Sequence, residues 1–85
     1  MLTKNRDRHA IVKTILSAVA ASNTSKLVTR TYLMYMCLLS NDQCKMYLNG
    51  MVKSGLLKLE DRQYDITEKG KKLLVTLLEL EKLID

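Results

Sequence analysis

The 85-residue sequence contains no phenylalanine, no tryptophan, one histidine and two cysteines. Without Phe or Trp, a core must be built from Leu, Ile, Val, Met and the four tyrosines. Cys37 and Cys44 are too few for a secreted disulfide scaffold, and we expect both to be small core residues. No run approaches the roughly 18 apolar residues that span a bilayer. These absences predict an intracellular protein with no membrane partner.

Motifs for catalysis and for cofactors are also missing. His9 has no Cys, Asp or Glu at the spacing of a metal site, and we expect it at the surface or at a helix end. The sequence has neither a glycine-rich phosphate loop nor a nucleophile motif. We therefore expect a protein that is not an enzyme and has no cofactor or metal, and no small-molecule ligand is evident.

Positive charge is concentrated in the first two-thirds of the chain. The formal net charge is +5. Residues 1–39 carry six basic and one acidic side chain (+5), residues 40–59 three and one (+2), and residues 60–85 five and seven (−2). This distribution favours a phosphate backbone as partner, although charge alone also permits anionic headgroups or acidic proteins.

Apolar spacing predicts two helices in the first half of the chain. The periodicity over residues 7–21 predicts the first helix, which the polar residues 22–25 end. A second helix is expected to begin near Val28 or Thr29. Its apolar face would carry Tyr32, Leu33, Met36 and Cys37.

Ser40 and Gln43 predict the start of a third helix. A serine followed three residues later by glutamine is a capping box, in which each side chain binds the backbone amide of the other residue. This helix would follow the second after about three residues, the spacing of a helix-turn-helix, and would end at Gly55 in a left-handed conformation. Its apolar face would carry Cys44, Tyr47, Leu48, Met51 and Val52, and its exposed face Asn41, Asp42, Lys45, Met46, Asn49 and Lys53.

A short hairpin and a long helix complete the predicted fold. Strands are expected over residues 56–60 and 63–66, with a turn at Asp61-Arg62, and the last helix over residues 68–84. Two apolar stripes on this helix predict burial against its own domain and against a second subunit, because a chain of this length is marginally stable alone. A single wide stripe packed within the monomer is the alternative. The seam expected at the dimer interface, with the spacing of a coiled coil, consists of Leu73, Leu77, Leu80 and Ile84.

Several short motifs occur in the order seen in one known family. They are Arg30-Thr31, Leu33-Met34-Tyr35, Leu39-Ser40 with Gln43, Tyr47-Leu48, Gly55-Leu56 and Tyr64-x-Ile66-Thr67-x-Lys69-Gly70. Over residues 8–84 the chain resembles the small archaeal winged-helix family that includes the ten-kilodalton Sulfolobus DNA-binding proteins, which dimerise through a terminal coiled coil. The sequence departs from the pattern of this family at two places. One is Cys37-Leu38 at the end of the second helix. The other is the wing, where acidic Glu60 and Asp61 beside Arg62 do not favour insertion into a minor groove.

We therefore predict a mainly α winged helix-turn-helix with a small β-hairpin wing and a coiled-coil-like C-terminal helix, forming one domain over residues 1–85. The expected function is binding of double-stranded DNA by a homodimeric transcription regulator or chromatin-like protein of the archaeal nucleoid, with residues 41–54 in the major groove. The rival is a protein-interaction module without DNA contact, and binding of single strands is disfavoured because the tyrosines mostly occupy predicted core faces. The candidate DNA-binding residues are Lys26, Arg30, Thr31, Ser40, Asn41, Gln43, Lys45, Asn49, Lys53 and Arg62.

Overall fold

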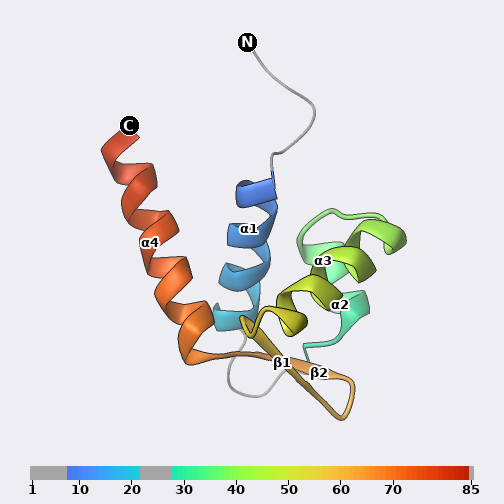
Figure 1. Cartoon of the computed structure of the whole chain (residues 1–85). Coiled ribbons are helices and arrows are strands. Elements are labelled where there is room, and N and C mark those ends of the chain that lie inside the picture. Colours follow the sequence, from blue (N-terminus) through green and yellow to red (C-terminus); the bar gives the residue numbers. More distant parts are fainter. Residues whose placement is uncertain (1–7, 22–27, 85) are drawn as a thin grey trace.

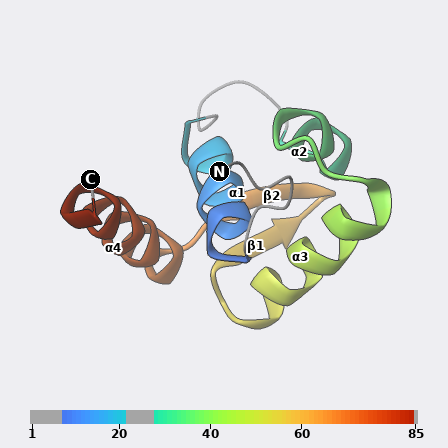
Figure 2. The ribbon, with the colours of Figure 1, turned by 90° about the horizontal axis from the view of Figure 1, so that it is seen from above.

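Four helices and one antiparallel hairpin make up the protein (Figure 1). The computed structural model describes residues 8–21 and 28–84. In chain order the elements are α1 (Arg8–Ala21), α2 (Arg30–Met36), α3 (Asn41–Lys53), β1 (Leu57–Glu60), β2 (Gln63–Ile66) and α4 (Glu68–Ile84). In both ribbon views α1 lies between α4 and the pair formed by α2 and α3 (Figures 1 and 2). The predicted fold is confirmed.

The core lies where α1, α2, α3 and the hairpin meet. Helix α1 contributes the buried side chains at its fourth, eighth and ninth positions and at Val19. Both cysteines are buried, as predicted. The buried apolar set is Ile11, Ile15, Leu16, Val19, Val28, Leu33, Cys37, Leu39, Cys44, Leu48, Met51 and Leu57.

Helix α2 is shorter than expected. Thr29 is its N-cap and accepts a hydrogen bond from the Tyr32 amide at 3.2 Å, so the helix begins at Arg30 rather than at Val28 or Thr29. Leu33 and Cys37 are buried, but Met36 is 56% exposed. The prediction that Met36 lies on the buried face is therefore wrong: Met36 is the last residue of α2, and more than half of its side chain is exposed.

Helices α2 and α3 end in the same backbone motif. After α3, Gly55 has φ +82°, and the amides of Gly55 and Leu56 donate to the Val52 and Met51 carbonyls at 3.0 and 2.9 Å. This is a Schellman motif with glycine at the left-handed position, as predicted. The same pattern after α2 places Leu38 at φ 56°, with its side chain 84% exposed. A bulky residue in this region is an outlier that the sequence did not predict.

The hairpin forms one wall of the domain. Leu57 pairs with Ile66 and Leu59 with Tyr64, which places these apolar residues on one face of the two strands. The Tyr64 amide also donates to the Val28 carbonyl at 2.8 Å, which joins the segment before α2 to β2. Asp61 and Arg62 both have positive φ, so the two-residue turn is of type I′.

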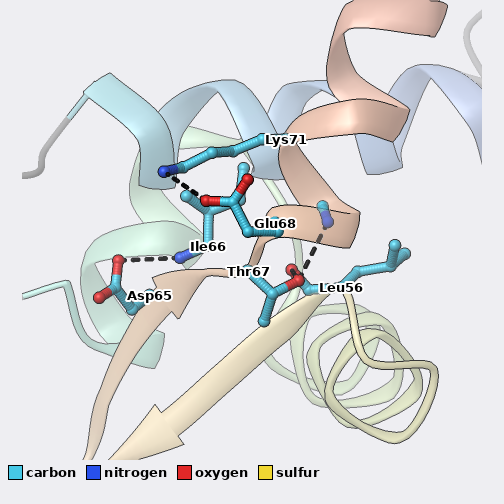
Figure 3. A network of polar contacts seen from close by, with 7 residues as sticks. Leu56, Asp65, Ile66, Thr67, Glu68 and Lys71 are labelled. Carbon is cyan, nitrogen blue, oxygen red and sulfur yellow. Dashed lines mark hydrogen bonds and ion pairs between the residues drawn. The ribbon is translucent and has the colours of Figure 1, made fainter.

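The start of α4 is attached to the segment that follows α3, where Thr67 lies beside Leu56 (Figure 3). The Thr67 hydroxyl donates to the Gly55 carbonyl at 2.6 Å and accepts from the Gly70 amide at 3.0 Å, so Thr67 caps α4. The Lys69 ammonium donates to the Ser54 carbonyl at 2.8 Å. Gly70 is buried, and a Cβ there would overlap the Leu56 carbonyl oxygen, so only glycine permits this close approach.

The second half of α4 leaves apolar side chains uncovered. Leu73, the first residue of the predicted seam, is half-buried and packs against the core. Leu74 also packs there; with Leu78 it forms the second apolar stripe, so both stripes begin against the same domain. Leu77 is half-buried, whereas Leu78 and Leu80 are 41% and 48% exposed. Because α4 extends away from α1 along this half (Figure 1), its own domain covers the stripe only in part. The side chain of Ile84 lies outside the described residues.

Candidate nucleic-acid interface

Helix α3 is held at its start by the predicted capping box. The Gln43 amide donates to Ser40 Oγ at 3.1 Å, and the Ser40 amide donates to Gln43 Oε1 at 3.2 Å. Both side chains are exposed and retain donors of their own, the Ser40 hydroxyl and the Gln43 amide NH₂. Asp42 in the first turn is placed favourably toward the helix dipole.

A line of polar side chains runs along the exposed side of α3. Asn41, Lys45 and Asn49 are spaced by four residues and all three are exposed. Cys44, Leu48 and Met51 on the same helix are buried, and Tyr47 and Val52 are half-buried. The predicted division of α3 into a core face and an exposed face is confirmed.

Two arginines line one cavity between the start of α2 and the hairpin turn. The cavity has a volume of about 440 Å³ and is bounded by Thr29, Arg30, Thr31, Leu59, Arg62 and Tyr64. Arg30 and Arg62 are both exposed, although 31 residues separate them in the chain. Two guanidinium groups at one cavity form a site suited to a phosphate, because each carries several N–H donors in a planar fork.

Two weak acids lie at or near this cavity: Tyr64 is part of its lining, and Cys44 is next to the backbone of Arg30. Burial raises the pKa of the Cys44 thiol, while the nearby positive charge of Arg30 lowers it by less. Burial also raises the pKa of the Tyr64 phenol, Cys44 adds to the rise, and Arg30 opposes it. Cys44 Sγ lies 3.6 Å from the Arg30 carbonyl oxygen. A buried thiol with a raised pKa is a poor nucleophile, so Cys44 is a structural core residue and not a reactive one.

The predicted contact residues fall into separate groups. The structure brings Arg30, Thr31 and Arg62 together at the cavity, and it places the Asn41, Lys45 and Asn49 line on α3. Lys53 is exposed in the last turn of α3, where a cation interacts favourably with the helix dipole. Lys26 lies outside the described residues.

Three residues of the cavity were not among the predicted contacts. Thr29 caps α2, and a threonine at the start of a helix is a local signal that could have been used. Leu59 and Tyr64 are neighbours across the hairpin and reach the cavity only because β2 pairs with the segment before α2. Their position depends on contacts between distant segments.

Within residues 8–21 and 28–84, no three His, Cys, Asp or Glu side chains are grouped so that they could hold a metal ion. None of the helices described is both long enough and apolar enough to cross a bilayer.

Helices α2 and α3, the short turn between them and the hairpin that follows have the arrangement of a winged helix-turn-helix. The model of the winged helix-turn-helix family matches residues 5–85, and the chain belongs to this family. It is similar to the crystal structure of Sso10a-2, a DNA-binding protein from Sulfolobus solfataricus, at 30% sequence identity and a TM-score of 0.71. That match covers 92% of this chain and 81% of the other, so the expected family resemblance is confirmed.

A second solved structure shares the fold at lower identity. The transcriptional regulator BldR from Sulfolobus solfataricus matches with 18% identity and a TM-score of 0.72. The match covers 88% of this chain and 57% of BldR, so this chain spans little more than half of that protein. No curated protein matches the sequence.

Proposed function

We propose that this protein binds double-stranded DNA, with α3 in the major groove and the two-arginine cavity on the phosphate backbone. The observation that carries the proposal is the exposed line of Asn41, Lys45 and Asn49 on the helix that follows the helix-turn-helix turn. Asn can donate to and accept from adenine, and Lys can donate to guanine or to a phosphate. The DNA-binding function of Sso10a-2 supports the same assignment.

Phosphate contacts position the duplex in this proposal. Arg30 and Arg62 lie at one cavity beside the start of α2 and bind backbone oxygens without reading sequence. Thr31 and the remaining side-chain donors of Ser40 and Gln43 supply further contacts to the DNA backbone. The protein then acts in the nucleoid, as a regulator of transcription or as a chromatin-like protein.

The test is a titration of fluorescent duplex DNA at several salt concentrations. Wild-type binding should weaken steeply with salt, with a log–log slope of about −0.9 for each phosphate neutralised. Lys45→Ala with Asn49→Ala should weaken binding by about tenfold or more, since each good base contact is worth roughly 1–3 kcal/mol. The control Lys72→Ala removes an exposed cation from α4 and should leave the affinity nearly unchanged.

The outcomes separate the two functions considered for this fold. Weak salt dependence, or unchanged binding by the α3 double variant, would contradict the proposal and favour a protein-interaction module. Circular dichroism of each variant shows whether a loss of binding reflects a loss of folding. Comparison of random duplex with genomic fragments then measures sequence preference.

We also propose that α4 joins two copies of the chain. Leu77 and Leu80 lie on the part of the stripe that its own domain covers least, and Leu83 beyond them is 82% exposed. Leu77→Glu with Leu80→Glu should convert a dimer into a monomer in sedimentation. Val75→Glu is the matched control, because Val75 is also exposed on α4 but lies roughly opposite Leu77 around the helix. A monomeric wild type would refute this interface.

A further inference from the structure

A second cavity lies on the other flank of α3, away from the line of Asn41, Lys45 and Asn49. Its volume is about 350 Å³, within the range of sites for small organic ligands. Residues from α1, from the second half of α3 and from the segment after it form the walls. They are Arg8, Val12, Met46, Tyr47, Gly50, Met51, Ser54 and Leu56.

Gly50 is unexpected at this position. It lies inside α3, where glycine is less stable than alanine because it loses more backbone freedom on folding. A Cβ added at Gly50 would meet no atom within 4 Å, so packing within the described chain does not require glycine there. Gly70 is the contrasting case, because a Cβ there would overlap backbone. Gly50 therefore leaves open space in the cavity wall.

The side chains of the cavity combine apolar surface with one cation. Val12, Met46, Met51 and Leu56 supply aliphatic and thioether surface, and Met46 is 60% exposed although it is apolar. Methionine side chains adapt readily to the shape of a bound molecule. Arg8 is exposed in the first turn of α1 and is the charged residue of the lining.

We propose that this cavity binds a small amphipathic organic anion. The apolar body lies against Val12, Met46 and Met51 in the space beside Gly50, and the anionic group accepts hydrogen bonds from the Arg8 guanidinium. The charge of Arg8 excludes small organic cations and favours a carboxylate or sulfonate over a neutral molecule of the same shape. A ligand at this site touches α3 on the flank that does not carry the polar line. The proposal is independent of DNA binding, and its test involves no DNA.

The experiment compares octanoate with 1-octanol, which has the same chain length without the charge. Each is titrated into the full-length protein, and backbone amide shifts are followed by NMR. Octanoate should cause saturable shifts at Gly50 and Met51 and bind more tightly than 1-octanol. Arg8→Gln should weaken octanoate binding by about tenfold, the value of one charge-assisted hydrogen bond, and bring its affinity close to that of 1-octanol.

A second variant tests the position of the site. Gly50→Leu places a side chain in the open space and should abolish the shifts caused by both molecules, whereas the control Lys72→Gln, on α4, should change neither affinity. Binding by Gly50→Leu equal to that of the wild type would place the probe on another apolar surface and overturn the proposal. So would the absence of saturable shifts in the wild type, or equal binding of octanoate by Arg8→Gln. If Gly50→Leu does not fold by circular dichroism, the wild-type shift map and Arg8→Gln decide the question.

Discussion

Replacing Arg62 by glycine should change stability and DNA affinity in opposite directions. Arg62 has φ 65° in a type I′ turn, at a position where glycine is preferred. A non-glycine residue in the left-handed region costs roughly 1–2 kcal/mol. Replacing Arg62 by glycine removes this cost, but the greater freedom of glycine in the unfolded chain offsets about 0.4–1 kcal/mol of the resulting stabilisation. Because the Arg62 side chain is exposed, few packing contacts are lost when it is removed.

The expected result is a net stabilisation of roughly 0.5–1 kcal/mol. For a domain of this size, each kcal/mol raises the Tm by about 4–8 °C. The same variant loses one of the two guanidinium groups at the proposed phosphate site, so the slope of log affinity against log salt should become shallower by about 0.9. Thermal unfolding followed by circular dichroism measures the first quantity, and fluorescence anisotropy of a labelled duplex in a salt series measures the second.

Asp61→Gly is the matched control. Asp61 has φ 51° in the same turn, so glycine there relieves the same kind of strain without removing a cation. It should raise the Tm and leave the salt slope no shallower. Arg62→Lys, which keeps both charge and strain, should behave as the wild type in both assays. If Arg62→Gly leaves the salt slope unchanged, Arg62 does not contact a phosphate, and if it lowers the Tm, the account of strain in the turn is wrong.

Two further predictions concern stability. Gly70→Ala should destabilise the fold by about 1–3 kcal/mol in urea unfolding, because the added methyl group meets rigid backbone. Gly50→Ala should instead stabilise the fold by roughly 0.5–1 kcal/mol. Equal effects of the two substitutions would contradict the packing described. The raised pKa values of Cys44 and Tyr64 mean that the folded state holds these protons more tightly than the unfolded state. Their contribution to the free energy of unfolding is therefore complete at neutral pH and is lost as pH rises from about 9 upward. Tyr64→Phe should make the free energy of unfolding fall less steeply with pH in this range. An unchanged fall would show that Tyr64 does not contribute to it.

The features predicted correctly from sequence share a local origin. The capping box at Ser40 and Gln43 joins residues three apart, and the left-handed end at Gly55 needs only a residue without a Cβ. The core face of α3 follows from spacing along one helix. The hairpin was located by its alternation, although the turn type depended on the φ values of Asp61 and Arg62, which their residue types do not indicate.

Errors arose where neighbouring elements decide the outcome. The apolar pattern of α2 halts at Leu38-Leu39-Ser40, close to the observed end of the helix at Met36, but it did not show how the helix ends. Leu38 takes the left-handed conformation that glycine usually occupies. Leu39 behind it is buried, and the Leu39 amide donates to the Met34 carbonyl at 3.0 Å, which holds the turn in place. The burial of a hydrophobic residue and two backbone hydrogen bonds thus outweigh an unfavourable local preference.

The sequence by itself determined the order of the helices, the capping box of α3 and the face that α3 buries, since these depend on hydrogen bonds and periodicities that extend over a few residues. Tertiary structure alone decided that Arg30 and Arg62 share a cavity, that Gly70 meets the backbone before β1, and that Gly50 borders open space. These relations depend on distances between segments far apart in the chain, which packing of the core sets and local sequence patterns do not encode.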